Sequence, residues 1–107
     1  MGVSASAVDV RSQDLGVLRA LFRRFPSVRE VRVFGSRATG RARRASDIDL
    51  AIDAPEAAPA EWGALREALD EAPIIFELDV VRRDTLASPR LLEKIAREGV
   101  VIYASAA

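Results

Sequence analysis

The segment from Asp47 to Asp53 constrains the fold most strongly, because its residues alternate between two kinds. It reads DIDLAID, with apolar residues at every second position and aspartates at three of the other four. Successive side chains of a β-strand point to opposite faces, so this pattern predicts a strand with one buried face. Aspartate is depleted in strands, and carboxylates on one face repel each other. The charged face of this strand therefore needs an explanation beyond folding.

Periodicity in the rest of the chain predicts further helices and strands. Helices are expected over residues 13–25, 60–71 and 88–98, and strands over 28–34, 47–52, 74–81 and 100–103. Ser12 and Ser88 are predicted helix N-caps, and Gly99 is a predicted C-cap. This order predicts an α/β (α+β) fold, in which a mixed β-sheet of about four strands is flanked by helices.

Length and composition fit one domain. The 107 residues are 50% hydrophobic and 30% charged, which is typical of globular proteins. We expect a single domain over residues 1–107, with frayed ends at 1–10 and 104–107. The apolar runs are too short to span a bilayer and the N-terminus does not resemble a signal peptide, so we expect a cytoplasmic protein.

The charge balance and two missing residue types restrict the possible chemistry. Sixteen basic residues balance sixteen acidic ones, which argues against non-specific nucleic-acid binding. The chain has no cysteine and no histidine, which excludes disulfides, thiolate nucleophiles, Ser-His-Asp triads and histidine-ligated zinc. Any catalysis must therefore use carboxylates, hydroxyls, arginines or a metal ion.

Gly35 and Ser36 follow the strand 28–34 and precede a segment that is expected to begin with a helical turn. Glycine lets the backbone approach a ligand closely, and backbone amides together with a serine hydroxyl can bind phosphate. A Gly-Ser turn after a strand is also a common structural element, and the spacing of a Walker A loop is absent. This pair becomes a candidate phosphate site only in combination with other residues.

Asp47, Asp49 and Asp79 form the second candidate group. Asp47 and Asp49 lie two positions apart on a strand, so their side chains emerge from the same face about 7 Å apart. They could share a cation such as Mg²⁺. A solvated edge strand would give the same pattern. Asp79 lies in the apolar strand 74–81, so three carboxylates would meet if this strand pairs beside 47–52. A metal is the simplest explanation, because repulsion and desolvation would otherwise be costly.

Together these motifs resemble the DNA polymerase β-like nucleotidyltransferase superfamily. Its pattern is a Gly-Ser pair at a strand end, a short loop, an Asp-x-Asp strand and a later third aspartate. The run GSRATGRARRASDID and Asp79 supply these parts in order, within a resemblance from Leu15 to Tyr103. The short chain is similar to the minimal nucleotidyltransferase (MNT) group, whose members are often encoded beside a HEPN-domain protein in toxin and antitoxin pairs.

The resemblance implies a role for each candidate residue. Asp47 and Asp49 would hold two Mg²⁺ ions, and Asp79 would bind the second ion and help to remove the proton of the acceptor hydroxyl. The β and γ phosphates of ATP would be bound by the loop after the first strand: Gly35, Ser36 and, as an additional clamp, Arg37. The acceptor hydroxyl would attack the α-phosphate in line, and pyrophosphate would leave.

Other residues near these motifs receive non-catalytic interpretations. Three loop arginines are expected to be solvated, with contact to a triphosphate or an acidic partner as the alternative: Arg41, Arg43 and Arg44. Ser46 is expected to support the loop. Asp53 and Glu77 are expected to face solvent, and Trp62 has the helical spacing of a core residue.

Three hypotheses address the acceptor. The first is an enzyme that transfers AMP from ATP to a hydroxyl of a partner protein, namely a tyrosine of a HEPN toxin, and so acts as an antitoxin. The second is a non-catalytic module that binds a nucleotide and the partner. The third is nucleotidyl transfer to a small molecule. The sequence leaves the preferred base open and is compatible with a homo-oligomer.

Overall fold

The computed structural model describes residues 8–105 and confirms the predicted alternation of helices and strands. A short helical turn after the first strand also forms as expected, and a 3₁₀ turn over Arg83–Thr85 is additional. In chain order the elements are α1 (Ser12–Arg23), β1 (Glu30–Phe34), α2 (Ser36–Thr39), β2 (Ile48–Asp53), α3 (Pro59–Asp70), β3 (Leu78–Arg82), η2 (Arg83–Thr85), α4 (Pro89–Glu98) and β4 (Val100–Ala104).

The four strands form one mixed sheet in the order β3-β2-β1-β4. β1 pairs antiparallel with both β2 and β4, whereas β2 and β3 run parallel. Parallel neighbours need a crossover connection, and α3 provides it between β2 and β3. The mixed sheet with flanking helices confirms the predicted fold class.

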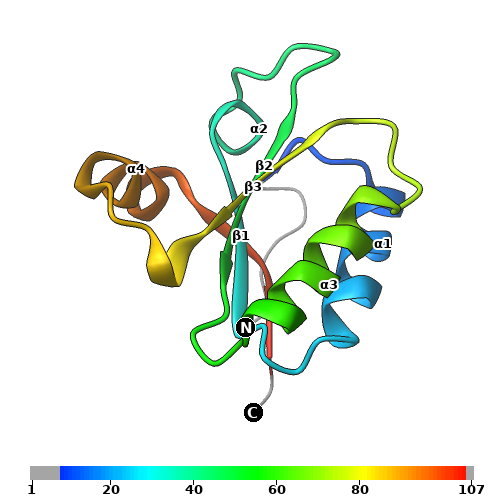
Figure 1. Cartoon of the computed structure of the whole chain (residues 1–107). Helices are drawn as coiled ribbons and strands as arrows, with labels where there is room; N and C mark the ends of the chain where they lie inside the picture. The colour runs from blue at the N-terminus through cyan, green and yellow to red at the C-terminus, as the bar shows by residue number, and fades with distance from the viewer. Residues whose placement is uncertain (1–7, 106–107) are drawn as a thin grey trace.

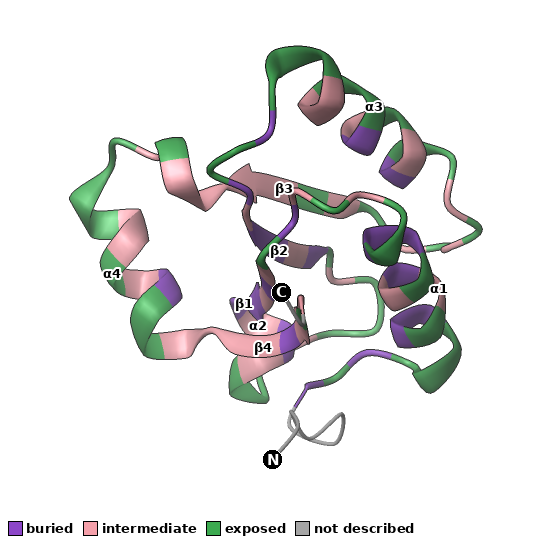
Figure 2. Cartoon of the chain, turned by 90° about the horizontal axis from the view of Figure 1, so that it is seen from below, coloured by how far each residue is buried: buried purple, intermediate pink, exposed green. Residues whose placement is uncertain are grey.

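Helices cover the two faces of the sheet unequally. Figure 1 shows α1 and α3 side by side over one face, while α4 lies on the other. The larger core cluster lies beneath α1 and α3, and its strand residues include Val31, Val33, Ile48, Leu50 and Ile52. Figure 2 shows that the buried positions of α1 and α3 face the strands. A smaller cluster of Phe34, Ala51 and Ile95 lies beneath α4.

Residues 8–10, the first that the structure describes, contact the core, so the fraying expected over 1–10 does not hold at these three positions. Val8 and Val10 are buried in the larger cluster, and the backbone amide of Asp9 donates a hydrogen bond of 2.7 Å to the carbonyl of Arg37. At the other end, Ala104 belongs to β4. The rest of both expected frayed ends, apart from Ser105, lies outside the described residues.

Two predicted boundaries are wrong for local physical reasons. Ser12 lies inside α1, where Arg11 precedes the helix and pairs with the buried carboxylate of Asp14 at 2.9 Å. The strand predicted over 74–81 begins only at Leu78, because the amide of Ile74 turns back to donate to the carbonyl of Ala72 at 2.7 Å. The Ser88 cap is confirmed, since its hydroxyl accepts a hydrogen bond from the Leu91 amide at 3.2 Å.

None of the helices within residues 8–105 has the length and apolar character needed to cross a lipid bilayer.

Candidate active site

The pairing of β2 with β3 brings two aspartates together. Asp49 and Asp79 are direct partners in this parallel pair, so the predicted neighbourhood of the two strands is confirmed. Paired residues of adjacent strands point to the same face of a sheet, at a strand spacing of about 4.8 Å. Leu78 and Val80 pack against the core under α1 and α3, so the two carboxylates lie on the opposite face, which carries α4. Asp49 is half-buried and Asp79 is exposed.

The electrostatics of Asp49 show that the other two candidate carboxylates act on it. Burial raises the pKa of the Asp49 carboxyl, and the negative charges of Asp79 and Asp47 raise that pKa further. The positive charge of Lys94 lowers it. Asp47 is exposed and lies just before β2. The geometry therefore pairs Asp49 with Asp79 and places Asp47 at the margin of the site.

This donor set suits a divalent cation of the magnesium type. Two oxygen donors stand side by side, and their mutual repulsion would be relieved by a positive ion. Within residues 8–105, no group of three or more acidic side chains is gathered closely enough to hold a metal ion. Asp49 and Asp79 could hold the ion, and Asp47, whose charge also acts on Asp49, is a candidate for a third ligand.

Gly35 lies directly against the Asp49 carboxylate. Its φ angle is +76°, a conformation that favours glycine, and any side chain at this position would overlap Oδ2 of Asp49. The backbone amide of Gly35 donates a hydrogen bond of 3.1 Å to Oε1 of Glu98. The helical turn α2 starts at the next residue, Ser36. The structure thus brings the Gly-Ser pair and the acidic pair into one site, as the motif requires.

Arg37 is a buried residue that braces the loop between α2 and β2. Its guanidinium donates to the carbonyl of Ser46 at 2.7 and 3.0 Å and to the carbonyl of Asp9 at 2.7 Å. It also lies over the ring of Phe76, with 4.3 Å between the guanidinium carbon and the ring centroid. These contacts favour a positioning role over the direct phosphate contact that the sequence suggests.

The exposed part of this loop carries the other arginines. Arg41, Arg43 and Arg44 are exposed, and Arg41 reaches the carboxylate of Glu98 at 3.5 Å. The Ser46 hydroxyl accepts a hydrogen bond of 2.8 Å from the amide of Arg43, which confirms that this serine supports the loop.

Two residues of α4 contribute to the site although their sequence pattern did not single them out. Glu98 holds the Gly35 amide, and the charge of Lys94, one helical turn earlier, acts on Asp49. Both follow β2 by more than forty positions, so only the tertiary fold reveals them. The available sequence signal was that Lys94 is the only lysine in the chain.

The remaining acidic and aromatic candidates lie outside the site. Asp53 is half-buried and pairs with Arg83 at 3.5 Å, which corrects its predicted exposure to solvent. Glu77 is exposed, as expected. Trp62 packs against the core as expected, and Arg82 lies over its ring at 5.1 Å.

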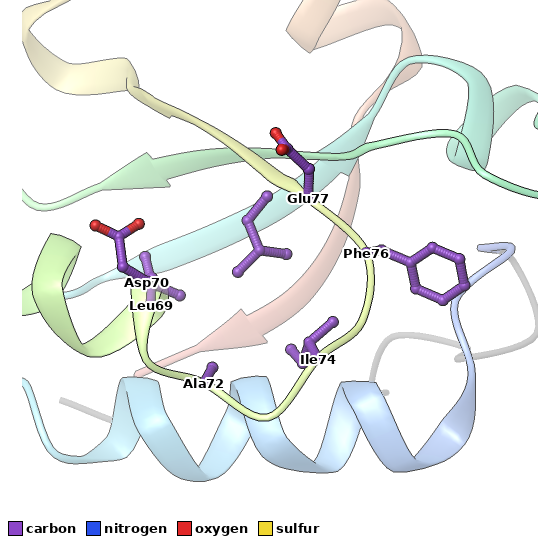
Figure 3. A pocket seen from close by; sticks show the side chains of 7 residues that line it. Leu69, Asp70, Ala72, Ile74, Phe76 and Glu77 are labelled. Atoms are coloured by element: carbon purple, nitrogen blue, oxygen red, sulfur yellow. The ribbon is translucent and has the colours of Figure 1, made fainter.

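A separate pocket of about 260 Å³ opens on the side of the sheet that carries α1 and α3. Figure 3 shows it enclosed by the end of α3 and the loop that leads to β3, with Leu69, Ala72 and Ile74 around it. Leu78 lines this pocket, whereas its neighbour Asp79 points to the other face of the sheet. The pocket is therefore not part of the aspartate site.

Comparison with known proteins identifies the family. The sequence of residues 17–106 matches the protein family described as "Polymerase beta, Nucleotidyltransferase". The chain belongs to this nucleotidyltransferase family. It is 31% identical over 81 residues to the "Probable protein adenylyltransferase MntA" of Haemophilus influenzae, an alignment covering 73% of this chain and 69% of the relative. The family match and this homology mark the chain as a nucleotidyltransferase.

Solved structures share the fold. A toxin–antitoxin complex with AMP-PNP matches with a TM-score of 0.63 and 24% identity, covering 87% of this chain and 75% of that chain. The toxin–antitoxin complex MntA-HepT matches with a TM-score of 0.58 and 23% identity, covering 89% and 74% respectively. At these identities the likeness establishes the fold.

Replacing Asp49 with asparagine should stabilise the metal-free protein at neutral pH. The folded-state pKa of Asp49 is raised, so its ionisation weakens the fold as the pH rises through that pKa. The asparagine side chain cannot ionise, so D49N should have a higher unfolding midpoint than wild type in a chelating buffer near pH 7, with the difference shrinking toward acidic pH. Thermal unfolding across pH measures this. A lower midpoint for D49N near pH 7 would contradict the assigned repulsion.

Replacing Arg37 with methionine tests its role in bracing the loop. Loss of its hydrogen bonds to the two carbonyls should lower the free energy of unfolding by about 1.5–3 kcal/mol, as is usual for bonds from charged donors. Urea denaturation measures the change. Arg43→Met, in the exposed part of the same loop, should change the stability by less than about 0.5 kcal/mol. If Arg37→Met and Arg43→Met both changed the free energy of unfolding by the same small amount, the positioning role of Arg37 would be contradicted.

Proposed function

We propose that this chain transfers AMP from ATP to a hydroxyl of a partner protein. One observation carries the proposal: Asp49 and Asp79 are register partners on one sheet face, and Gly35 lies directly against Asp49. This arrangement puts the candidate phosphate loop beside the candidate metal ligands. The name of the Haemophilus influenzae relative, a probable protein adenylyltransferase, supports the same reaction class, and ATP as the donor favours action in the cytoplasm.

In the proposed reaction, the acceptor oxygen forms a bond to the α-phosphorus as the bond to the bridging oxygen breaks. Pyrophosphate carries away the electron pair of the broken bond. Two Mg²⁺ ions, with Asp47, Asp49 and Asp79 as ligands, would neutralise the phosphates and lower the pKa of the acceptor hydroxyl. Asp79 is the exposed member of the carboxylate pair, so it can take up the acceptor proton. Ser36 offers its hydroxyl to the β and γ phosphates.

The position of β3 supports a protein as the acceptor. β3 is an edge strand of the sheet, and Asp79 is exposed on it, so a side chain of a second protein can reach this carboxylate. Two of the fold relatives are toxin–antitoxin complexes. We therefore propose that the acceptor is a tyrosine of a HEPN-domain toxin and that its adenylylation silences the toxin.

The test uses the product of the neighbouring gene as acceptor. The protein is incubated with Mg²⁺, α-labelled ATP and that partner, and label on the partner is quantified. Asp49→Asn and Asp79→Asn should lower the labelling rate by at least about 10²-fold, and Asp47→Asn should lower it as well. Asp53→Asn is the matched control, because Asp53 lies on the same strand and outside the carboxylate pair.

The outcomes separate transfer from binding. Label that appears with wild type and D53N, but not with D49N or D79N, supports adenylylation. Neutralisation of the partner's toxicity that survives these substitutions would instead show a module that acts by binding alone.

A further inference from the structure

Lys94 is unusual in both composition and place. The chain has sixteen basic residues, and this is the only lysine among them. It lies in α4, the helix that packs on the sheet face carrying Asp49 and Asp79 (Figure 1). Lysine presents a compact point charge on a flexible stem, whereas arginine presents a planar fork, so the two are not equivalent as ligands.

Two residues that follow Lys94 on α4 fix the orientation of the helix toward the site. Ile95 is fully buried against Phe34 and Ala51, which anchors the helix to β1 and β2. Glu98, one turn beyond Lys94, accepts the hydrogen bond from the Gly35 amide at 3.1 Å. Residues four apart lie on the same helix face. Lys94 therefore projects from the face of α4 that meets the Gly-Ser turn.

The Lys94 ammonium has no partner of its own among residues 8–105, where it forms neither an ion pair nor a hydrogen bond. Its neighbours differ, because Arg41 and Arg97 both pair with Glu98. Lys94 is half-buried and lies one helical turn before Glu98, whose carboxylate accepts the hydrogen bond from the Gly35 amide. A half-buried cation thus lies on the helix face that meets the Gly-Ser turn, without a committed anion.

We propose that Lys94 is a substrate-binding residue whose ammonium contacts the triphosphate of the bound nucleotide. Lysine commonly serves as a point charge against phosphate oxygens. The inference rests on the proposed function, because it requires that a nucleotide binds beside Gly35 and Asp49. Gly35 and Ser36 offer only neutral groups to a phosphate. Lys94 would add a positive charge to the site from α4.

A purely structural role makes a different prediction. If Lys94 served only to offset the negative charge of Asp49, its loss would change stability and leave the preference for a triphosphate unaltered. Direct contact predicts a selective effect, in which binding of a nucleoside triphosphate weakens and binding of the monophosphate does not. The comparison of AMP-PNP with AMP therefore distinguishes the two roles.

The experiment measures the Kd of AMP-PNP and of AMP, each with Mg²⁺, by calorimetry on the full chain. Lys94→Gln should weaken AMP-PNP binding by about tenfold or more, which corresponds to one charged hydrogen bond, and leave the affinity for AMP unchanged. Lys94→Arg should restore most of the affinity because it keeps the charge. Arg90→Gln, an exposed position on the same helix, is the control for net charge and should bind as wild type does.

Each result has one meaning. A selective loss in K94Q with recovery in K94R establishes the contact. Equal AMP-PNP affinity in K94Q and wild type overturns the role of Lys94 and leaves the proposed function intact. Absence of AMP-PNP binding by the wild-type protein overturns both. Lys94→Ala provides a second charge-removing variant if K94Q does not fold by circular dichroism.

Discussion

The parallel pairing of β2 with β3 is the constraint on which the site depends. Its register sets Asp49 opposite Asp79, while Leu78 and Val80 enter the core on the other face. A slip of one residue would turn Asp79 into the apolar core and expose its neighbours, at a large cost in free energy. The apolar half of β3 therefore determines where its carboxylate lies. Folding and function use alternate residues of the same short strand.

The site also lowers the stability of the folded chain, and packing elsewhere in the fold offsets this loss. Asp49 is held beside another carboxylate and partly out of water, which raises its pKa. Gly35 adopts a left-handed conformation against it, where no other residue fits without overlap. The fully buried residues Ile48, Leu50 and Ile52 on the opposite side of β2 hold this strand in place. Such local destabilisation at a functional site is typical of enzymes and is relieved when the ligand binds.

Features set by local periodicity were predictable from sequence. The alternation around Asp49 identified β2, and the spacing of the motif identified the family, since both depend on neighbouring residues. Features set by tertiary packing were not predictable. The strand expected from residue 74 starts late, because the chain turns after Pro73 and Phe76 packs against Arg37. Similarly, Lys94 comes near Asp49 only because Ile95 packs α4 against Phe34 and Ala51 of the sheet.

The most direct measurement of the central claim locates a bound metal within the folded chain. Mn²⁺, which replaces Mg²⁺ and broadens nearby nuclear magnetic resonance signals, is titrated into isotope-labelled protein with AMP-PNP. The amide signals of Gly35, Asp49 and Asp79 should broaden first, and those of residues lining the separate pocket, such as Ala72, should broaden last. Two results would contradict the assignment of this aspartate pair as the metal and nucleotide site. One is broadening centred on the residues of the separate pocket, and the other is broadening that is as strong in Asp49→Asn as in the wild-type protein.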